Sequence, residues 1–94
     1  MIIKYSPSFL KTFKKVDVRI RKSFKERILI FSKNPHDLQL NNHTLKDEYE
    51  GYRSIDINSD WRAVYKEAKI EKETIAYFSD LGTHEHLFKH IAKS

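Results

Sequence analysis

Histidine, aspartate and arginine side chains in the second half of the chain are of the types that cleave RNA without a metal. Such cleavage needs a base for the 2′-hydroxyl proton, a cation for the charge on the phosphorane, and an acid for the leaving 5′-oxygen. The residues with suitable side chains are His43, Arg53, Asp56, Asp60, Arg62 and His84. Tyr52, Trp61 and Phe88 are aromatic residues of the kind that stack on bases. RNA cleavage is therefore one candidate chemistry.

Each of these residues also has an ordinary structural interpretation. Arg53 and Arg62 suit solvent-facing positions on strands, and Asp60 suits a turn. Trp61 is as readily a core residue, and His43 a loop histidine. Residue types and spacing alone leave both interpretations open.

Metal binding is a weaker alternative for the histidines near the C-terminus. His86 and His90 are four residues apart and would share one face of a helix, whereas His84 and His86 would share a face only in extended chain. The chain has no Cys, and no carboxylate stands at a familiar zinc-motif spacing from these histidines. We therefore expect neither a metal nor another cofactor.

The positive charge is concentrated in the first third of the chain. The net charge is +5, but residues 1–33 hold ten Lys and Arg against two acidic residues, or +8. Residues 34–94 hold eight basic and eleven acidic residues, or −3. A basic segment of this kind favours attraction to a polyanion, either nucleic acid or an acidic partner protein. A solvated helix face is the simpler explanation of the same pattern.

The length of 94 residues predicts one domain, residues 1–94, with one modest core. The longest apolar cluster, RILIF at 27–31, is far too short to span a bilayer, and no secretory signal is recognisable. The lack of Cys excludes disulfide bonds. We expect a cytoplasmic protein with no membrane partner.

The first third of the chain predicts a strand followed by two helices. Residues 1–6 alternate as in a strand, and Ser6 followed by Pro7 is typical of a helix start. Apolar residues then recur every three or four positions: Phe9, Phe13, Val16, Ile20, Phe24, Ile28 and Phe31. We expect this stripe to break near 15–18, with Asp17 capping the second helix, and to end before Pro35.

The second half of the chain predicts strands joined by short turns. Alternating residues at 52–57, 61–67 and 73–81 indicate three strands. Their short connections imply an antiparallel meander. A short helix is expected at about 84–92. The expected class is therefore α+β, with an antiparallel sheet, an N-terminal helical pair on one of its faces, and a short C-terminal helix.

Two segments of the second half carry a recognisable motif. HTLKDEYEGYRSIDINSDWRAVYK at 43–66 and LGTHEHLF at 81–88 resemble the RelE/ParE toxin superfamily, and within it the YafQ-like mRNA interferases. The matching positions are His43, Leu45, Gly51, Arg53, Asp60, Trp61, Gly82, Thr83, His84 and Phe88. The opening strand and the basic helices suit the same RelE-like fold, which is similar to that of small microbial RNases.

The resemblance implies a toxin of a type II toxin–antitoxin system. Members of the superfamily cut mRNA, usually in the ribosomal A site, and leave a 2′,3′-cyclic or 3′-phosphate and a 5′-hydroxyl. A cognate antitoxin binds such toxins in a hetero-oligomer. By position, His84 would be the leading acid or base, assisted by His43 or Asp60, and Trp61 and Phe88 would hold the RNA.

The chain departs from the family pattern at two positions. YafQ-like enzymes often have His in place of Asp56, where a carboxylate would still serve as a base. They often have Arg in place of Asp80, where a negative charge now replaces a phosphate-binding cation. Arg53, Arg62 and Lys46 are the residues that would compensate.

Two other functions are compatible with the same fold. A ParE-like toxin would poison DNA gyrase, but such relatives tend to lack the catalytic histidine that His84 and His43 would supply here. A catalytically weakened domain would act mainly as antitoxin partner and co-repressor, and Asp56 and Asp80 would then mark a decayed site.

Overall fold

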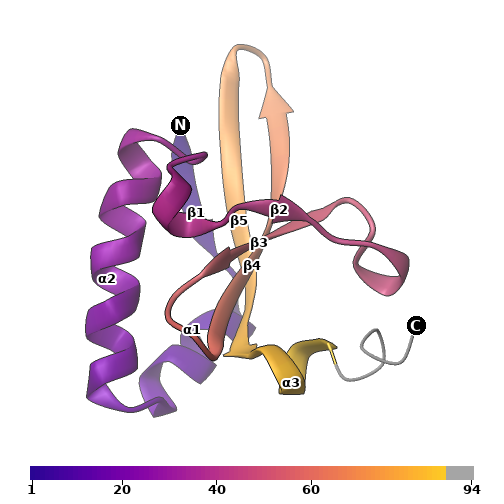
Figure 1. The fold of residues 1–94 in the computed structure, drawn as a ribbon. Helices are drawn as coiled ribbons and strands as arrows, with labels where there is room; N and C mark the ends of the chain where they lie inside the picture. The colour runs from indigo at the N-terminus through magenta and orange to yellow at the C-terminus, as the bar shows by residue number, and fades with distance from the viewer. Residues whose placement is uncertain (89–94) are drawn as a thin grey trace.

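The computed structural model describes residues 1–88, in which a five-stranded sheet carries two helices on one face and a short helix at its end (Figure 1). The strands are β1 (Ile2–Tyr5), β2 (His43–Thr44), β3 (Tyr52–Asp56), β4 (Trp61–Ile70) and β5 (Glu73–Thr83). The helices are α1 (Pro7–Lys15), α2 (Val18–Lys33) and α3 (His84–Phe88), with 3₁₀ turns at Leu38–Leu40 and Asp47–Tyr49. The expected α+β class is confirmed.

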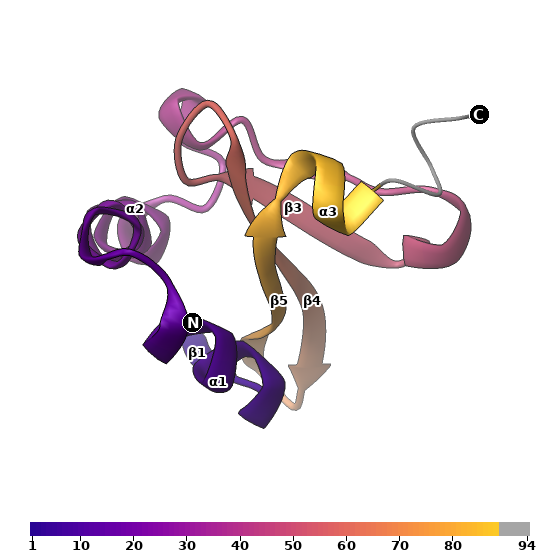
Figure 2. The same ribbon diagram turned by 90° about the horizontal axis from the view of Figure 1, so that it is seen from below.

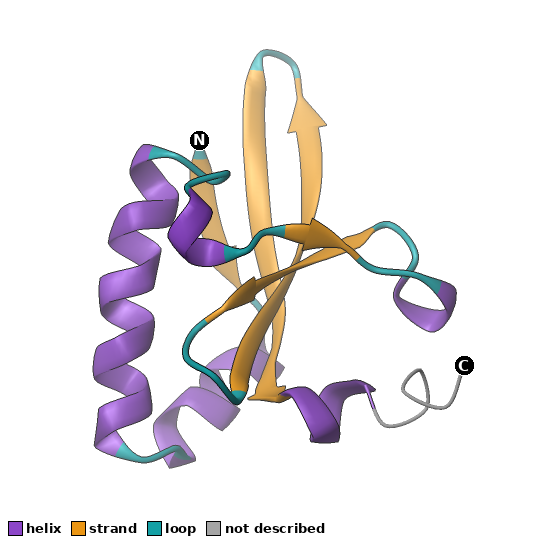
Figure 3. Ribbon diagram, viewed as in Figure 1, coloured by secondary structure: helices purple, strands orange, loops and turns teal. Residues whose placement is uncertain are grey.

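The sheet has the strand order β1-β5-β4-β3-β2. The pairings of β2 with β3, β3 with β4 and β4 with β5 are antiparallel, as the short turns predicted. The pairing of β1 with β5 is parallel, so the sheet as a whole is mixed. Parallel neighbours require a long crossover connection, and α1, α2 and the following strands supply it (Figure 3).

The turn from β1 into α1 is held by Ser6. The N–H of Phe9 donates to Ser6 Oγ at 2.9 Å, which is the predicted N-cap, and Pro7 occupies the first helical position. Ser6 Oγ also donates to the carbonyl of Ser79 at 3.0 Å, and the N–H of Ser6 donates to the carbonyl of Phe78 at 2.9 Å. Ser6 therefore links the start of α1 to the backbone of β5.

We expect Ser6→Ala to lower the free energy of unfolding by about 1–2 kcal/mol, because it removes the helix cap and the bond to the Ser79 carbonyl. Urea unfolding followed by circular dichroism measures the change. Ser8→Ala, an exposed position in the same helix, is the control and should change stability by about 0.5 kcal/mol or less. Equal effects of the two substitutions would contradict the capping role.

The break between the two helices falls at Val16 and Asp17, within the predicted interval. Asp17 Oδ1 accepts from the N–H of Arg19 at 2.7 Å and caps α2. This backbone bond, with the Arg19 guanidinium beside it, lowers the pKa of Asp17 from its usual value. The cap therefore operates at neutral pH and is lost as the pH falls through this lowered pKa. None of the helices within residues 1–88 has the length and apolarity to cross a membrane.

The hydrophobic core lies between the sheet and the α1–α2 pair, which cover the same side of the strands (Figure 2). It is built mainly from aromatic rings. The buried aromatic residues of this cluster are Phe9, Phe24, Phe31, Tyr65 and Phe78. Phe78 on β5 is central, since its ring centroid lies 5.0 Å from that of Tyr65 and 5.3 Å from that of Phe31. The sheet side facing this core is called the helix-covered face below, and the other side the open face.

Candidate active site

Asp60 and His84 lie together at one end of the sheet, where the β3–β4 turn meets the end of β5 (Figure 1). The N–H of His84 donates to the carbonyl of Asp60 at 2.7 Å. The neighbouring residues Trp61 and Thr83 are paired across β4 and β5. Both the Asp60 carboxylate and the His84 imidazole are on exposed residues, so a carboxylate and an imidazole are presented to solvent at the same corner.

The β3–β4 turn is shaped by Asn58, which is not among the site residues predicted from the sequence. Asn58 Oδ1 accepts from the N–H groups of Asp60 at 2.9 Å and Trp61 at 2.8 Å. A side-chain oxygen of Asn that accepts from the N–H two residues later forms an Asx turn, and the Asn-Ser-Asp sequence at 58–60 is typical of one. Asn58 therefore fixes the backbone that carries Asp60.

Helix α3 begins at His84 and packs back onto the open face. The N–H of His86 donates to Thr83 Oγ1 at 3.1 Å, so the Thr83 hydroxyl caps the start of this helix. A Cβ on Gly82 would lie 3.0 Å from Leu87 Cγ, so glycine permits the close approach of α3 to β5. His86 is exposed on the helix. The predicted continuation of this helix to residue 92 lies outside the described residues.

Asp56 and Arg62 face each other across β3 and β4 on the open face. Asp56 Oδ1 lies 2.9 Å from Arg62 Nε, and the side chains are only 27% and 15% exposed, respectively. Arg62 Nη1 also donates to the carbonyls of Asn58 at 2.8 Å and Trp61 at 3.0 Å, and Nη2 donates to that of Ser59 at 3.2 Å. The sequence predicts a catalytic role for Asp56 and RNA binding for Arg62. In the structure the two side chains pair with each other, and Arg62 also supports the turn.

We expect Arg62→Met to lower the free energy of unfolding by about 2 kcal/mol, because it leaves the half-buried Asp56 carboxylate without its cation. Chemical unfolding at neutral pH measures this. The matched control is Lys66→Met on the same strand, where an exposed ammonium lies 5.5 Å from the Tyr52 ring and contributes about 1 kcal/mol or less. A loss no larger than the control's would show that Arg62 does not hold the turn.

Arg53 and Trp61 lie on the helix-covered face, away from Asp56. Arg53 is opposite Tyr65 in the sheet, and its Nε donates to Asn42 Oδ1 at 2.8 Å. Asn42 Nδ2 in turn donates to the Tyr65 hydroxyl at 2.7 Å, and burial raises the pKa of this tyrosine. Arg53 therefore belongs to a polar network at the edge of the core rather than to the Asp60–His84 corner.

Trp61 packs against the core and also borders a polar cleft of about 420 Å³. The cleft lies between the start of α2 and the β3–β4 turn. Its other lining residues are Asp17, Arg19, Ile20, Ser23, Asn58, Ser59 and Asp60. Trp61 is thus next to Asp60 and is half-buried at the cleft.

His43 and Lys46 lie near the opposite edge of the sheet. His43 on β2 is opposite Ser54 on β3, and it lies three strands from β5, or roughly 14 Å at the usual strand spacing. His43 Nδ1 is 2.7 Å from the carbonyl of Asn41, which can only accept, so in the neutral ring Nδ1 bears the proton and Nε2 keeps its lone pair. Lys46 is exposed just beyond β2.

Phe88, a predicted RNA-binding residue, is buried in a second aromatic cluster on the open face. Its ring centroid lies 5.6 Å from that of Tyr49 and 5.1 Å from that of His84. Burial, followed by the Asp80 and Glu48 carboxylates, raises the pKa of Tyr49 above its usual value. The Phe88 ring therefore packs against the His84 ring and helps to orient it. The Asp80 carboxylate places a negative charge beside this aromatic cluster.

The possible metal ligands do not converge within residues 1–88. No three His, Asp or Glu side chains in this part of the chain are grouped closely enough to hold a metal ion. The His, Asp and Glu residues of this part of the chain are instead spread over the Asp60–His84 corner, the two faces of the sheet and its β2 edge. Of the predicted site residues, the structure brings together Asp60, Trp61 and His84, and it holds Phe88 against His84.

Comparisons with known proteins agree with this fold. The family model for "Bacterial toxin of type II toxin-antitoxin system, YafQ" matches residues 1–89. YafQ from E. coli superposes with a TM-score of 0.72 at 28% identity, covering 92% of this chain and 96% of that one. A YoeB/ParE toxin from Agrobacterium tumefaciens, at 20% identity, has a TM-score of 0.73 and coverage of 89% and 99%.

The E. coli DinJ–YafQ complex is a further similar structure, with a TM-score of 0.60 at 28% identity and coverage of 92% of this chain and 96% of that chain. A search of curated protein sequences finds no match. The family match extends over nearly the whole chain and includes both motif segments. The chain therefore belongs to the YafQ family of bacterial toxins from type II toxin–antitoxin systems.

Proposed function

We propose that this toxin is a ribosome-dependent endoribonuclease that cleaves mRNA in the cytoplasm and is controlled by a cognate antitoxin. The observation that carries the proposal is the 2.7 Å bond from the His84 N–H to the Asp60 carbonyl. It holds an imidazole and a carboxylate at one exposed corner, and these are the two kinds of group that acid–base cleavage of RNA requires.

In the proposed reaction, Asp60 accepts the proton of the 2′-hydroxyl as O2′ attacks the adjacent phosphorus. The bond from phosphorus to O5′ breaks, and His84 as imidazolium donates its proton to the leaving O5′. The products are a 2′,3′-cyclic phosphate and a 5′-hydroxyl. Asp60 is favoured over His43 as the base, because its backbone is bonded to that of His84 whereas His43 lies at the β2 edge. Trp61, beside Asp60, supplies a ring on which a base can stack.

The dependence on the ribosome follows from the charges around this corner. Arg62 is already paired with Asp56, and Asp80 adds a further carboxylate to the open face. A site with so little unpaired positive charge binds the phosphate of free RNA weakly. Its cleavage rate therefore gains most when the ribosome already holds the mRNA in position. The basic helices α1 and α2 supply the attraction to ribosomal RNA.

Cleavage assays with purified components test this proposal. The toxin is incubated with a defined mRNA, either free or placed in the A site of programmed ribosomes, and the new ends are identified. We expect cuts on the ribosome that leave a 2′,3′-cyclic phosphate and a 5′-hydroxyl, and little cleavage of free mRNA. A DNA gyrase supercoiling assay runs in parallel, and inhibition of gyrase without mRNA cleavage would replace this function with the ParE-like one.

A catalytically weakened toxin is the second candidate, and the open-face charges favour it. Asp56 neutralises Arg62, and Asp80 lies beside the Tyr49 cluster where a cation would bind phosphate better. Such a protein would still bind an antitoxin. Its overexpression would leave growth unchanged, and programmed ribosomes would show no cleavage, whereas the enzyme proposed above arrests growth.

A further inference from the structure

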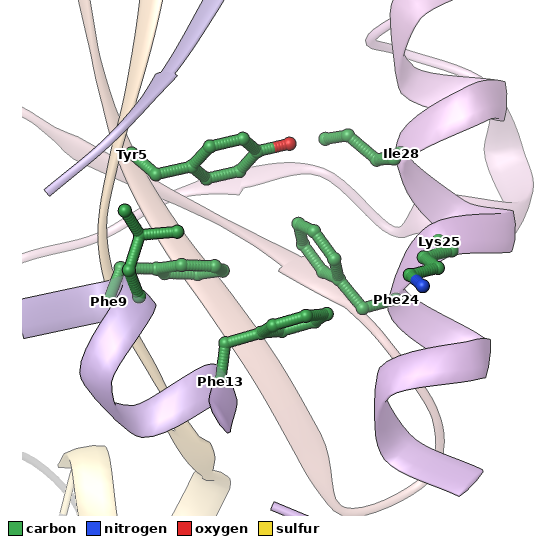
Figure 4. Close-up of a pocket in the computed structure, with 7 residues that line it drawn as sticks. Tyr5, Phe9, Phe13, Phe24, Lys25 and Ile28 are labelled. Carbon is green, nitrogen blue, oxygen red and sulfur yellow. The ribbon is translucent and has the colours of Figure 1, made fainter. Parts of the chain in front are cut away.

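Residues 1–88 contain two groups of contacting aromatic rings, one on each side of the sheet. The first belongs to the core on the helix-covered side, and Figure 4 shows its outer part, where aromatic and apolar side chains of β1, α1 and α2 line a pocket of about 210 Å³. The second lies on the open face and reaches the Asp60–His84 corner. This second group is small, and one of its rings is the imidazole of the proposed catalytic acid.

The rings of the open-face group form a continuous row from β3 to His84. The centroid of the Tyr52 ring on β3 lies 6.0 Å from that of Tyr49, and the Tyr49 centroid lies 5.6 Å from that of Phe88. The Phe88 centroid is in turn 5.1 Å from that of the His84 imidazole. Interplanar angles of 88°, 80° and 63° make each contact edge-to-face, which is a favourable geometry for aromatic pairs. The row therefore connects the sheet to the imidazole through side-chain contacts.

Helix α3 is too short to fix the orientation of the His84 side chain by itself. It has five residues, and isolated helices shorter than about 12–15 residues are marginal in water. The bond from the His84 N–H to the Asp60 carbonyl fixes the backbone but does not restrict rotation of the imidazole about its side-chain bonds. Phe88 packs against that imidazole and is only 5% exposed, so the position of its own ring depends on what packs around it. Tyr49 is the next ring in the row.

Tyr49 is brought to Phe88 by a loop of defined backbone shape. The loop joins β2 to β3, and the N–H of Leu45 closes it by donating to the carbonyl of Tyr52 at 3.0 Å. Two backbone bonds of 3.1 Å hold the 3₁₀ turn that ends at Tyr49. Gly51 then has a φ of 91°, a left-handed conformation that favours glycine. Gly51 is a matching position of the motif with no part in the proposed reaction, and this loop gives it a structural role.

We propose that Tyr49 is a positioning residue for the cleavage reaction. Its ring, supported by Tyr52, holds Phe88 in place, and Phe88 keeps the His84 imidazole in the orientation from which it protonates the leaving 5′-oxygen. The catalytic use of the imidazole rests on the function proposed above, whereas its orientation is a property of the free toxin. A catalytic group displaced by about 1 Å can lose on the order of 100-fold in rate, so the support of this ring bears directly on catalysis.

The aromatic ring of Tyr49, and not its hydroxyl, performs this function. Both contacts of Tyr49 within the row are contacts between rings. Burial, followed by the Asp80 and Glu48 carboxylates, raises the pKa of the hydroxyl, so it remains uncharged at neutral pH. Tyr49→Phe should therefore keep the orientation of His84, whereas Tyr49→Leu and Tyr49→Ala should not.

Nuclear magnetic resonance of the free toxin tests the orientation without any RNA. In the wild type we expect nuclear Overhauser contacts between the Phe88 and His84 rings, whose centroids are 5.1 Å apart. These contacts should persist in Tyr49→Phe. They should be lost in Tyr49→Ala and in Tyr49→Leu, which keeps an apolar side chain on the loop, and the His84 ring resonances should move toward those of exposed His86. The amide resonance of His84 reports its bond to Asp60 separately and should stay unchanged in Tyr49→Leu.

Single-turnover cleavage on programmed ribosomes tests the consequence for the reaction. Tyr49→Ala should lower the maximal rate about 10–100-fold, while the ribosome concentration that gives half of this rate stays within about twofold of wild type. Tyr49→Phe should retain the wild-type rate. Tyr77→Ala, which removes a 41% exposed tyrosine of the same face outside the row, is the matched control and should leave both values unchanged. A weaker half-saturation at an unchanged maximal rate would make Tyr49 an RNA-stacking residue and would overturn the positioning role.

The two measurements also separate this proposal from the enzymatic one. Ring contacts in the wild type that depend on Tyr49, with no cleavage on programmed ribosomes, remove the enzymatic function alone and leave Tyr49 as the residue that orients His84. Ring contacts and cleavage that both survive in Tyr49→Ala and Tyr49→Leu remove the positioning role alone.

Discussion

Replacing His84 with alanine is expected to reduce mRNA cleavage on programmed ribosomes by about 10²–10⁴-fold, the usual contribution of a general acid or base. The imidazole is the acid in the proposed reaction, and its loss leaves the 5′-oxygen to depart as a poor leaving group. The backbone bond from residue 84 to the Asp60 carbonyl does not use the side chain, so the corner itself should persist. Single-turnover cleavage of a labelled mRNA measures the effect.

His86→Ala is the matched control for this prediction. His86 is exposed on the same short helix and is the other described histidine there, so its removal should leave the cleavage rate within about twofold. Circular dichroism should show the same fold for both variants. Cleavage by His84→Ala at the wild-type rate would exclude His84 as the acid, and an equal loss in both variants would point to α3 as a structural element only.

Asp60→Asn separates the two candidate bases, because it keeps the shape of the side chain and removes its ability to accept a proton. A large loss in Asp60→Asn with little change in His43→Gln is the expected pattern. The opposite pattern would assign the base to His43, whose Nε2 keeps its lone pair in the neutral ring.

The helix boundaries were predictable from the sequence because their signals are local. Ser6 and Asp17 each accept a backbone N–H within three residues, so the residues that decide each boundary are neighbours in the chain. The meander was predictable for the same reason, since the connections between its strands are short. The parallel pairing of β1 with β5 was not, because it depends on packing across the whole helical crossover.

The candidate site was predictable in part. The pairing of Trp61 with Thr83 places Asp60 beside His84, and each motif segment contributes residues to that point. The faces of Arg53 and Asp56 depend instead on register, since neighbouring positions on a strand point to opposite sides. Residue types alone do not predict that Arg62 forms an ion pair with Asp56 and donates hydrogen bonds to the carbonyls of the turn. Arg62 has a side chain of a type suited to catalysis, but its hydrogen bonds hold the turn that carries Asp60, and Asp56 is its ion-pair partner.

Phe78→Ala is expected to cause the largest loss of stability, about 3–5 kcal/mol in the free energy of unfolding. The Phe78 ring is fully buried and lies at the centre of the aromatic core. Its ring neighbours are Tyr5, Phe9, Phe24, Phe31 and Tyr65, at centroid distances of 5.0–6.1 Å. Domains of this size are typically stable by about 5–15 kcal/mol, so the loss would unfold a substantial part of the population on mild heating.

The adjacent residue on β5 provides the control, because Tyr77 is 41% exposed and points away from the core. Tyr77→Ala should cost about 1 kcal/mol or less in the same urea titration. Phe78 also precedes the part of β5 that delivers Thr83 and His84 to the corner, so cleavage by Phe78→Ala should fall in proportion to the unfolded fraction and recover on cooling. A small stability loss for Phe78→Ala would mean that the surrounding rings collapse into the space, and the core would then be far more adaptable than its close ring contacts indicate.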